Sequence, residues 1–227
     1  MDKRLTLIKD MVRPCGTVAD IGTDHGYLVC ALVAEGIAKR GIAADINPMP
    51  LDKARRQIDT EGLAGQIDTV LTDGLSCITL GDGDGVAIAG MGGELIARIL
   101  ADWQYTKIAS IDYYLQPMTK PEKLRDYLYR TGFAIVAERC CVAAGRPYSV
   151  IHARYCGRPA TPTPAECFLG QIDPQAGEAE AAYCRKLQAR LGRKLAGLTA
   201  SGTESHEAES LRAIIGEIAR RTGHESC

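Results

Sequence analysis

The chain has 227 residues, 46% of them hydrophobic and 24% charged, and its formal net charge is −1. Such a composition is typical of a globular domain, and positive and negative charges balance both before and after residue 158, which excludes a uniformly basic nucleic-acid-binding chain. No apolar run approaches the about 20 residues that span a bilayer, and the N-terminus lacks the apolar core of a signal peptide, so we expect a cytoplasmic protein.

The nine cysteines are an odd number and include no Cys-x-x-Cys pair. Metal ligation by cysteine needs clustered spacing, which this sequence does not have. We therefore predict reduced thiols with a structural role, and no metal site.

Strand-like and helix-like segments alternate along the chain up to residue 131. Short apolar runs that end at turn residues predict strands over residues 17–21, 39–45, 67–71, 85–89 and 111–116. Glycine turns and prolines in first helical turns predict helices between them, over residues 27–35, 48–61, 94–103 and 121–131. Such alternation favours right-handed β-α-β units and an open parallel sheet.

Two β-rich runs follow, over residues 133–143 and 147–155, and the short segment between them predicts a hairpin. Parallel strands that end in a hairpin are the layout of the Rossmann-like, seven-stranded methyltransferase sheet, rather than of a dinucleotide dehydrogenase. We therefore predict an α/β fold, with a first domain over residues 1–158.

The rest of the chain, residues 159–227, predicts a linker and a helical hairpin. Residues 157–164 are rich in proline and have the composition of a linker. Apolar side chains recur at helical spacing within residues 178–198 and again within residues 211–218, after a polar loop at residues 199–206. We predict two antiparallel, coiled-coil-like helices, which bury little surface alone and need to dock on the sheet domain or on a partner.

The turn after the first strand is the most informative motif. Asp20-Ile21-Gly22-Thr23-Asp24-His25-Gly26 ends that strand, and glycines in a strand-to-helix turn let the backbone approach a ligand closely. Asp45 ends the second strand, where a carboxylate accepts hydrogen bonds from the two hydroxyls of a ribose. Together they predict a nucleoside-cofactor site at the carboxyl edge of the sheet, although a turn with only a structural role would use the same residues.

Two further turns are expected at the same edge. Asp73-Gly74 follows the third strand, where an acidic side chain can meet an adenine amino group. Gly90-Met91-Gly92-Gly93 follows the fourth strand, and its backbone can line the face of a planar substrate. Met91 can pack against an aromatic base or fill the core.

Polar side chains near these turns are candidates for contacts with a base or with RNA. Asp24 and His25 lie inside the glycine turn, and the Gln116 amide at the end of the fifth strand can bond a base edge. Five cations of the first C-terminal helix predict either a phosphate-binding surface or a solvated helix face: Arg185, Lys186, Arg190, Arg193 and Lys194. A second set of cations either extends that surface or is solvated: Arg98, Lys120, Lys123 and Arg125.

With these motifs in place, the chain resembles the bacterial tRNA (adenine-22-N1)-methyltransferase family. The resemblance covers about residues 4–156 and, more loosely, the rest of the chain. It rests on these runs: Arg4-Leu5, Ala19 to Leu28, Asp73-Gly74-Leu75, Ile88 to Gly93, Leu115-Gln116-Pro117 and Leu124-Arg125. The Asp-His turn joined to Gly-Met-Gly-Gly is more specific than a generic methyltransferase glycine motif.

The resemblance implies an S-adenosylmethionine-dependent enzyme that methylates N1 of an adenine in tRNA. Its cofactor would be bound by Asp20, Gly22, Asp24, Gly26, Asp45, Ile46, Asp73, Gly74, Gly90 and Met91. Within that set, Asp20 would orient the turn near the methionine amino group. Asp24 and His25 would position the adenine, and the RNA would be held by Gly92, Gly93, Gln116, Arg185, Lys186, Arg190, Arg193 and Lys194.

Two positions depart from the family pattern. Met118 stands where family members usually have asparagine, which removes a polar substrate contact, and Asp45 stands where they often have glutamate, which is conservative. Three other hypotheses remain at this point. A methyltransferase of small molecules or proteins would share the cofactor site without needing the helical tail, a silent tRNA-binding protein would not consume cofactor, and a nucleotide-dependent oxidoreductase would bind NAD instead.

Overall fold

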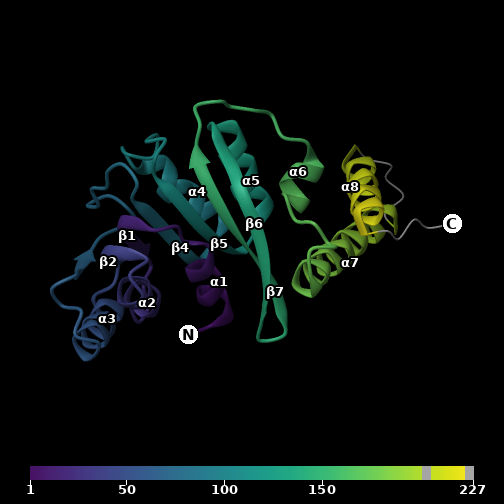
Figure 1. Ribbon diagram of the computed structural model, residues 1–227. Helices are drawn as coiled ribbons and strands as arrows, with labels where there is room; N and C mark the ends of the chain where they lie inside the picture. Colours follow the sequence, from purple (N-terminus) through teal and green to yellow (C-terminus); the bar gives the residue numbers. More distant parts are fainter. Residues whose placement is uncertain (201–205, 223–227) are drawn as a thin grey trace.

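The computed structural model describes residues 1–200 and 206–222 and consists of one sheet, helices on both of its faces and a helical extension (Figure 1). The strands are β1 (Cys15–Ile21), β2 (Ala38–Asp45), β3 (Ile67–Leu71), β4 (Gly85–Gly92), β5 (Asp112–Thr119), β6 (Phe133–Ala143) and β7 (Arg146–Tyr155). The helices are α1 (Lys3–Met11), α2 (Tyr27–Ala34), α3 (Pro48–Thr60), α4 (Gly93–Asp102), α5 (Pro121–Arg130), α6 (Pro164–Leu169), α7 (Glu178–Ala200) and α8 (His206–Thr222).

The sheet has the strand order β3-β2-β1-β4-β5-β7-β6. The first five strands pair in parallel, whereas β7 pairs antiparallel with both β5 and β6. The order reverses between β1 and β4, and ligands of open α/β sheets bind at the carboxyl ends of strands beside such a switch point. The seven-stranded Rossmann-like sheet with a terminal hairpin, predicted from the sequence, is confirmed.

Two hydrophobic cores hold the helices against the two faces of the sheet. Helices α1, α2 and α3 pack on one face through buried aliphatic side chains such as Ile8, Leu32 and Ile58. Helices α4 and α5 pack on the other face, where Leu100 and Leu124 belong to a core that also holds the Trp103 ring. Both faces of the central parallel strands are therefore buried, which explains their continuous apolar runs.

The helical extension packs on the outer strand of the hairpin. A third core joins α6, α7 and α8, and it includes Cys140 of β6 together with Leu187 and Ile214. In Figure 1 these helices lie beyond the β6–β7 hairpin, on the side away from β1. Of the two docking partners that the sequence left open, the structure shows the sheet domain.

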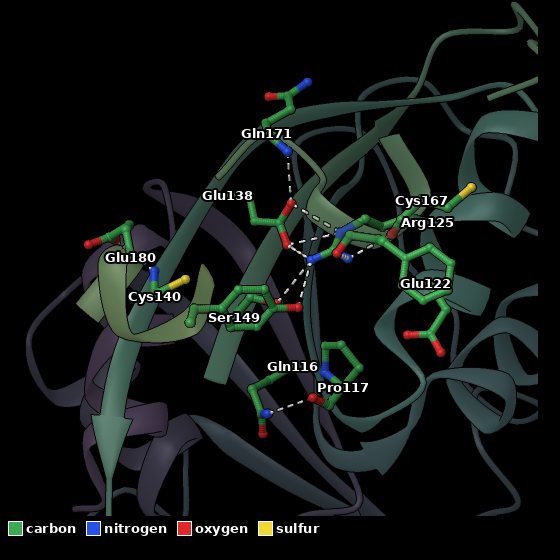
Figure 2. Close-up of polar contacts among 12 residues, drawn as sticks. Gln116, Pro117, Glu122, Arg125, Glu138, Cys140, Ser149, Cys167, Gln171 and Glu180 are labelled. Atoms are coloured by element: carbon green, nitrogen blue, oxygen red, sulfur yellow. Dashed lines mark hydrogen bonds and ion pairs between the residues drawn. The ribbon is translucent and has the colours of Figure 1, made fainter. Parts of the chain in front are cut away.

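A buried ion pair of the sheet domain also contacts the extension (Figure 2). Arg125 of α5 lies 2.5 Å from Glu138 of β6, and both side chains are 0% exposed. The same guanidinium donates to the carbonyl oxygens of Cys167 and Phe168 and to the hydroxyl of Tyr183. Both sequence interpretations of Arg125, as part of an RNA surface or as a solvated cation, are therefore wrong.

The structure differs from the sequence prediction at three further places. Helix α1 was not predicted, and the expected linker at residues 157–164 ends in α6, whose N-terminus carries a capping box formed by Thr163 and Glu166. Both ends of the loop expected at residues 199–206 are helical, because α7 continues to Ala200 and α8 begins at His206. The rest of that loop, residues 201–205, lies outside the described part. Within the described ranges, no helix is long and apolar enough to cross a membrane.

Candidate functional site

A cavity of about 750 Å³ opens at the carboxyl ends of β1, β2 and β4, and we call it the edge pocket. It contains eight of the ten predicted cofactor-binding residues. Its full lining is Met1, Asp2, Arg4, Leu5, Asp20, residues 22–28, Asp45, Ile46, Asn47, Ala89, Gly90 and Met91. Its volume lies within the range of about 300–1,000 Å³ that is typical of small-molecule and cofactor sites.

The glycine turn forms the floor of the edge pocket, and its conformation requires glycine. Gly22 and Gly26 have φ of 76° and 70°, a region that side chains disfavour. The backbone N–H groups of Gly22 and Thr23 donate to the Ala44 carbonyl at 2.8 and 3.0 Å, which fixes the turn to the end of β2. A Cβ on Gly22 would collide with the end of the Met91 side chain, so the absence of a side chain on Gly22 lets Met91 pack against the turn.

Two carboxylates of different character lie beside that turn. Asp20 is 6% exposed, and burial raises its pKa to about 6, with the charge of Asp45 adding to the rise and a hydrogen bond from Thr23 opposing it. The Asp45 side chain is half-buried at the end of β2, and its Oδ1 accepts from the Asn47 N–H at 2.8 Å. A buried carboxylate with a raised pKa in a cavity is typical of a functional site, because a cationic ligand group would stabilise its charge.

Asp24 and His25 lie at the mouth of the edge pocket, as the sequence suggested. The Asp24 side chain is 71% exposed, with the His25 Nε2 at 3.3 Å and the Lys53 Nζ at 3.6 Å from its two oxygens. The His25 ring stacks on Tyr27, with 5.2 Å between ring centroids. Asp24 can therefore reach a base that enters the pocket from outside.

The end of β4 forms the opposite wall. Gly90 has φ of 81° and sits in a bulge, where the register with β5 shifts between Ala89 and Met91. Its N–H donates to the Gln116 Oε1 at 3.1 Å, and the Gln116 Nε2 donates to the Pro117 carbonyl at 3.1 Å. Gln116 is fully buried, so in this structure it holds the bulge in place and does not present its amide to a base.

Four other predicted residues lie outside the edge pocket. Asp73 lines a separate cavity of about 40 Å³ beside α4, and Gly74 packs on Ile99. Gly92 adjoins Thr119, and Gly93 is buried against the Lys120 carbonyl, where a Cβ would collide. The glycine at position 93 therefore lets α4 and α5 begin close together. Met91 packs on the core and also lines the edge pocket, and its contact with an aromatic base stays a prediction.

The five predicted cations of α7 differ in their surroundings. Arg185 and Lys194 pair with Glu178 and Glu207, each at 2.5 Å, and Arg193 is exposed. Lys186 and Arg190 instead line a second cavity, between α7 and the β6–β7 turn. The acidic partners of these cations are Glu207 of α8, Glu122 of α5 and Glu178 in the first turn of α7. All three lie outside residues 185–194, so the charges of that segment alone do not predict these ion pairs.

The sequence interpretation missed the N-terminal wall of the edge pocket. Met1, Asp2, Arg4 and Leu5 line it because α1 begins there, with the Asp2 carboxylate accepting from the Arg4 N–H at 2.7 Å as an N-cap. Asp2 ahead of an apolar helical pattern is the signal that could have predicted this helix. Among the described residues, no group of three or more His, Cys, Asp or Glu side chains could hold a metal ion.

Comparisons with known proteins agree with this geometry. A family model described as a methyltransferase domain matches residues 1–151. The tRNA (adenine(22)-N(1))-methyltransferase of Bacillus subtilis is 35% identical over 153 residues, which span 67% of this chain and 64% of that enzyme.

Solved structures match nearly the whole chain. A Streptococcus pneumoniae protein solved in complex with S-adenosyl-L-methionine has a TM-score of 0.80 and 28% identity, over 98% of this chain and 99% of that one. The Bacillus subtilis M1A22 tRNA methyltransferase has a TM-score of 0.79 and 25% identity, over 99% of this chain and 96% of that one. The likeness to solved structures thus includes the helical extension as well as the sheet.

Proposed function

The chain belongs to the methyltransferase-domain family, and we propose that it transfers a methyl group from S-adenosylmethionine to N1 of an adenine in tRNA, in the cytoplasm. The observation that carries the proposal is that Asp20 and Asp45 lie on either side of the Gly22 turn and line one cavity at the switch point of the sheet. The name of the Bacillus subtilis relative states the same activity. We infer that adenine 22 of the tRNA, the position given in that name, is also the acceptor for this chain.

The residues of the edge pocket fit the chemistry of S-adenosylmethionine. Asp20 offers a carboxylate to a cationic amino group in a buried position, where charge attraction is strong. Asp45 offers acceptor oxygens to ribose hydroxyls one strand away. Gly22 and Met91 line the same cavity as these two carboxylates, and that cavity has the volume of a cofactor site. When bound, this cofactor would supply an electrophilic methyl group on a positively charged sulfur.

The role of the protein in the reaction is to position the acceptor. Adenine N1 has a lone pair in the ring plane, so it needs no general base, and holding it in line with the methyl group accounts for much of the catalysis. The base must leave any duplex pairing to expose N1. Asp24 at the pocket mouth would favour the positive charge that the ring acquires on methylation, and His25 would help to orient the base.

The direct test of the proposal uses the full chain. Bulk unmodified tRNA is incubated with the protein and labelled S-adenosylmethionine, digested, and analysed for the methylated nucleoside. We expect label in 1-methyladenosine. Label in another nucleoside would refute the adenine-N1 assignment, and no label in RNA despite cofactor binding would favour a protein or small-molecule acceptor.

Replacing Asp45 with alanine is expected to weaken binding of S-adenosylhomocysteine at least about tenfold, because hydrogen bonds to charged groups contribute about 1.5–3 kcal/mol. Isothermal titration calorimetry measures this effect. The matched control is Asp45→Glu, which keeps the carboxylate and is expected to bind within a few-fold of the unaltered protein. Equal affinity in the alanine variant would remove Asp45 from the cofactor site.

Replacing Asp24 with alanine is expected to lower kcat about tenfold or more while cofactor affinity stays within a few-fold, because the exposed carboxylate acts on the charge that develops in the base. Single-turnover methylation of tRNA measures the loss. Asp68→Ala is the control, since Asp68 is exposed and pairs with Arg40 on the outer strands. Unchanged turnover in the Asp24 variant would exclude a role for this residue in catalysis.

A further inference from the structure

A second cavity lies beside the edge pocket, between the turn of the β6–β7 hairpin, the end of β5 and helix α7. It has a volume of about 270 Å³, and we call it the hairpin pocket. Pro117, Pro147 and Leu187 give it apolar walls, whereas Tyr148, Lys186 and Arg190 give it an aromatic ring and two cations. The volume is below the range of about 300–1,000 Å³ that suits drug-sized ligands, so it fits a single base better than a second cofactor.

Two cationic side chains lie close to the Tyr148 ring, one from α1 and one from α7. The Lys186 Nζ lies 5.4 Å from the ring centroid, and the Arg4 guanidinium carbon lies 5.5 Å from it. Tyr148 is half-buried and lines the hairpin pocket. An aromatic ring among cations is the arrangement that binds a base by stacking and its phosphate by charge.

Positive charge in the hairpin pocket is incompletely neutralised. Lys186 donates to the Pro147 carbonyl at 3.3 Å, a neutral acceptor. Its pKa lies below the ordinary value because of burial and of repulsion by Arg146 and Arg190. Arg190 lies 3.3 Å from Glu122, which is the acidic side chain that faces it. A bound anion at Lys186 would relieve this repulsion.

A contact between Arg4 and Met118 joins the wall of the edge pocket to the wall of the hairpin pocket. Arg4 lines the edge pocket, and its Nη1 donates to the Met118 Sδ at 2.9 Å, while Met118 lines the hairpin pocket. The Gln116 side chain, which holds the Gly90 bulge, lies next to the same contact, 3.4 Å from the Arg4 Nη1. An RNA strand that places one base in the edge pocket therefore has the hairpin pocket within reach of an adjacent nucleotide.

We propose that the hairpin pocket binds a nucleotide of the RNA next to the methylated adenine, with the base on Tyr148 and the phosphate at Lys186 and Arg190. The inference rests on the proposed function, since it presumes an RNA acceptor. A free inorganic anion would need the cations but not the proline and leucine walls, whereas a nucleotide uses both. Phosphate contacts fix the position of the strand, and stacking accepts any base, so this site would hold the strand without reading its sequence.

The experiment compares tRNA affinity across variants of the full-length protein, saturated with S-adenosylhomocysteine and titrated at several salt concentrations. Lys186→Gln is expected to weaken binding about fivefold and to reduce the magnitude of the salt slope by about 0.7–0.9, the change for one lost phosphate contact. Tyr148→Leu is expected to weaken binding about fivefold or more, whereas Tyr148→Phe, which keeps the ring, binds like the unaltered protein.

The control is Lys39→Gln, because Lys39 is an exposed lysine at the amino end of β2, away from both pockets. It is expected to leave affinity and salt slope unchanged, and calorimetry should show the same S-adenosylhomocysteine affinity in all variants. Equal tRNA affinity in Lys186→Gln and the control would overturn the proposal, as would equal losses in Tyr148→Leu and Tyr148→Phe.

The outcomes separate this inference from the proposed function. A protein that binds tRNA but forms no 1-methyladenosine would refute the proposed function, while the affinity series would still decide the role of the hairpin pocket. A protein without affinity for tRNA would refute both. Methylation by all variants with unchanged KM for tRNA would support the function and overturn the hairpin-pocket inference.

Discussion

Replacing Glu138 with alanine is expected to lower the free energy of unfolding by about 3–5 kcal/mol, because it leaves the Arg125 guanidinium buried without its charge partner. The two side chains are 0% exposed, so water cannot replace the lost carboxylate. The remaining partners of Arg125 are all neutral: the Cys167 and Phe168 carbonyls and the Ser149 and Tyr183 hydroxyls. They satisfy its N–H groups but do not neutralise its charge.

Equilibrium unfolding in urea measures this loss, with Glu178→Ala as the control. Glu178 also pairs with an arginine, but its side chain is 82% exposed, and surface pairs of this kind contribute at most about 1 kcal/mol. The double replacement Arg125→Met with Glu138→Leu should recover much of the loss, because an apolar pair of similar volume needs no desolvation of charge. A loss below about 1 kcal/mol in Glu138→Ala would show that the pair is not what stabilises this junction.

The position of this pair also decides how the extension can be tested. Cys167, Phe168 and Tyr183 belong to residues 160–227, so deleting that segment removes several partners of Arg125 together with the third core. Such a deletion would expose buried surface of β6 and confound an RNA-binding measurement with instability. Point substitutions at exposed residues such as Lys186 are therefore the sharper test of RNA contacts.

The sheet could be predicted from the sequence because its signals are local. The strand at residues 67–71 and the first strand of the hairpin, at 133–143, were predicted with their observed bounds, since turn residues flank both. Helix α6 was missed because its six residues are too few for periodicity, and only the Thr163–Glu166 capping box marks it. Helix α1 was missed although Asp2 provides an N-cap.

The site could be predicted in part, where strand ends determine position. Asp20 and Asp45 end neighbouring parallel strands, so topology alone brings them to one edge. The direction of a side chain depends on tertiary packing, which the local sequence does not show. In the structure, Asp73 lines a different cavity and Gln116 is buried behind the Gly90 bulge. The hairpin pocket was not predicted, because it forms only when α7 packs beside the β6–β7 turn.

Asp20 is the group for which stability and function are expected to conflict most. Its pKa is about 6 in the folded chain against a reference value of 3.8, so the folded state favours the protonated form. The contribution of Asp20 to the free energy of unfolding is therefore fully present below about pH 4 and is lost as the pH rises through about 6. The loss amounts to about 3 kcal/mol. Asp20→Asn, which has no proton to lose, is expected to be more stable than the unaltered protein at pH 8 and equally stable at pH 4.

Thermal unfolding at the two pH values measures this difference, and an equal shift at both would mean that packing, and not charge, is responsible.

Cofactor affinity should have the opposite pH dependence and rise with pH, because a cationic amino group needs the ionised carboxylate. With a pKa of about 6, the affinity for S-adenosylhomocysteine should be about tenfold lower at pH 5 than at pH 7. His25→Gln, which changes another ionisable group of the turn, should keep this dependence, whereas Asp20→Asn should bind weakly at both pH values. A variant without Asp20 that retains the tenfold change would assign the titration to a different group. The expected combination, a more stable protein that no longer binds its cofactor, would show that the buried carboxylate is retained for binding at the expense of stability.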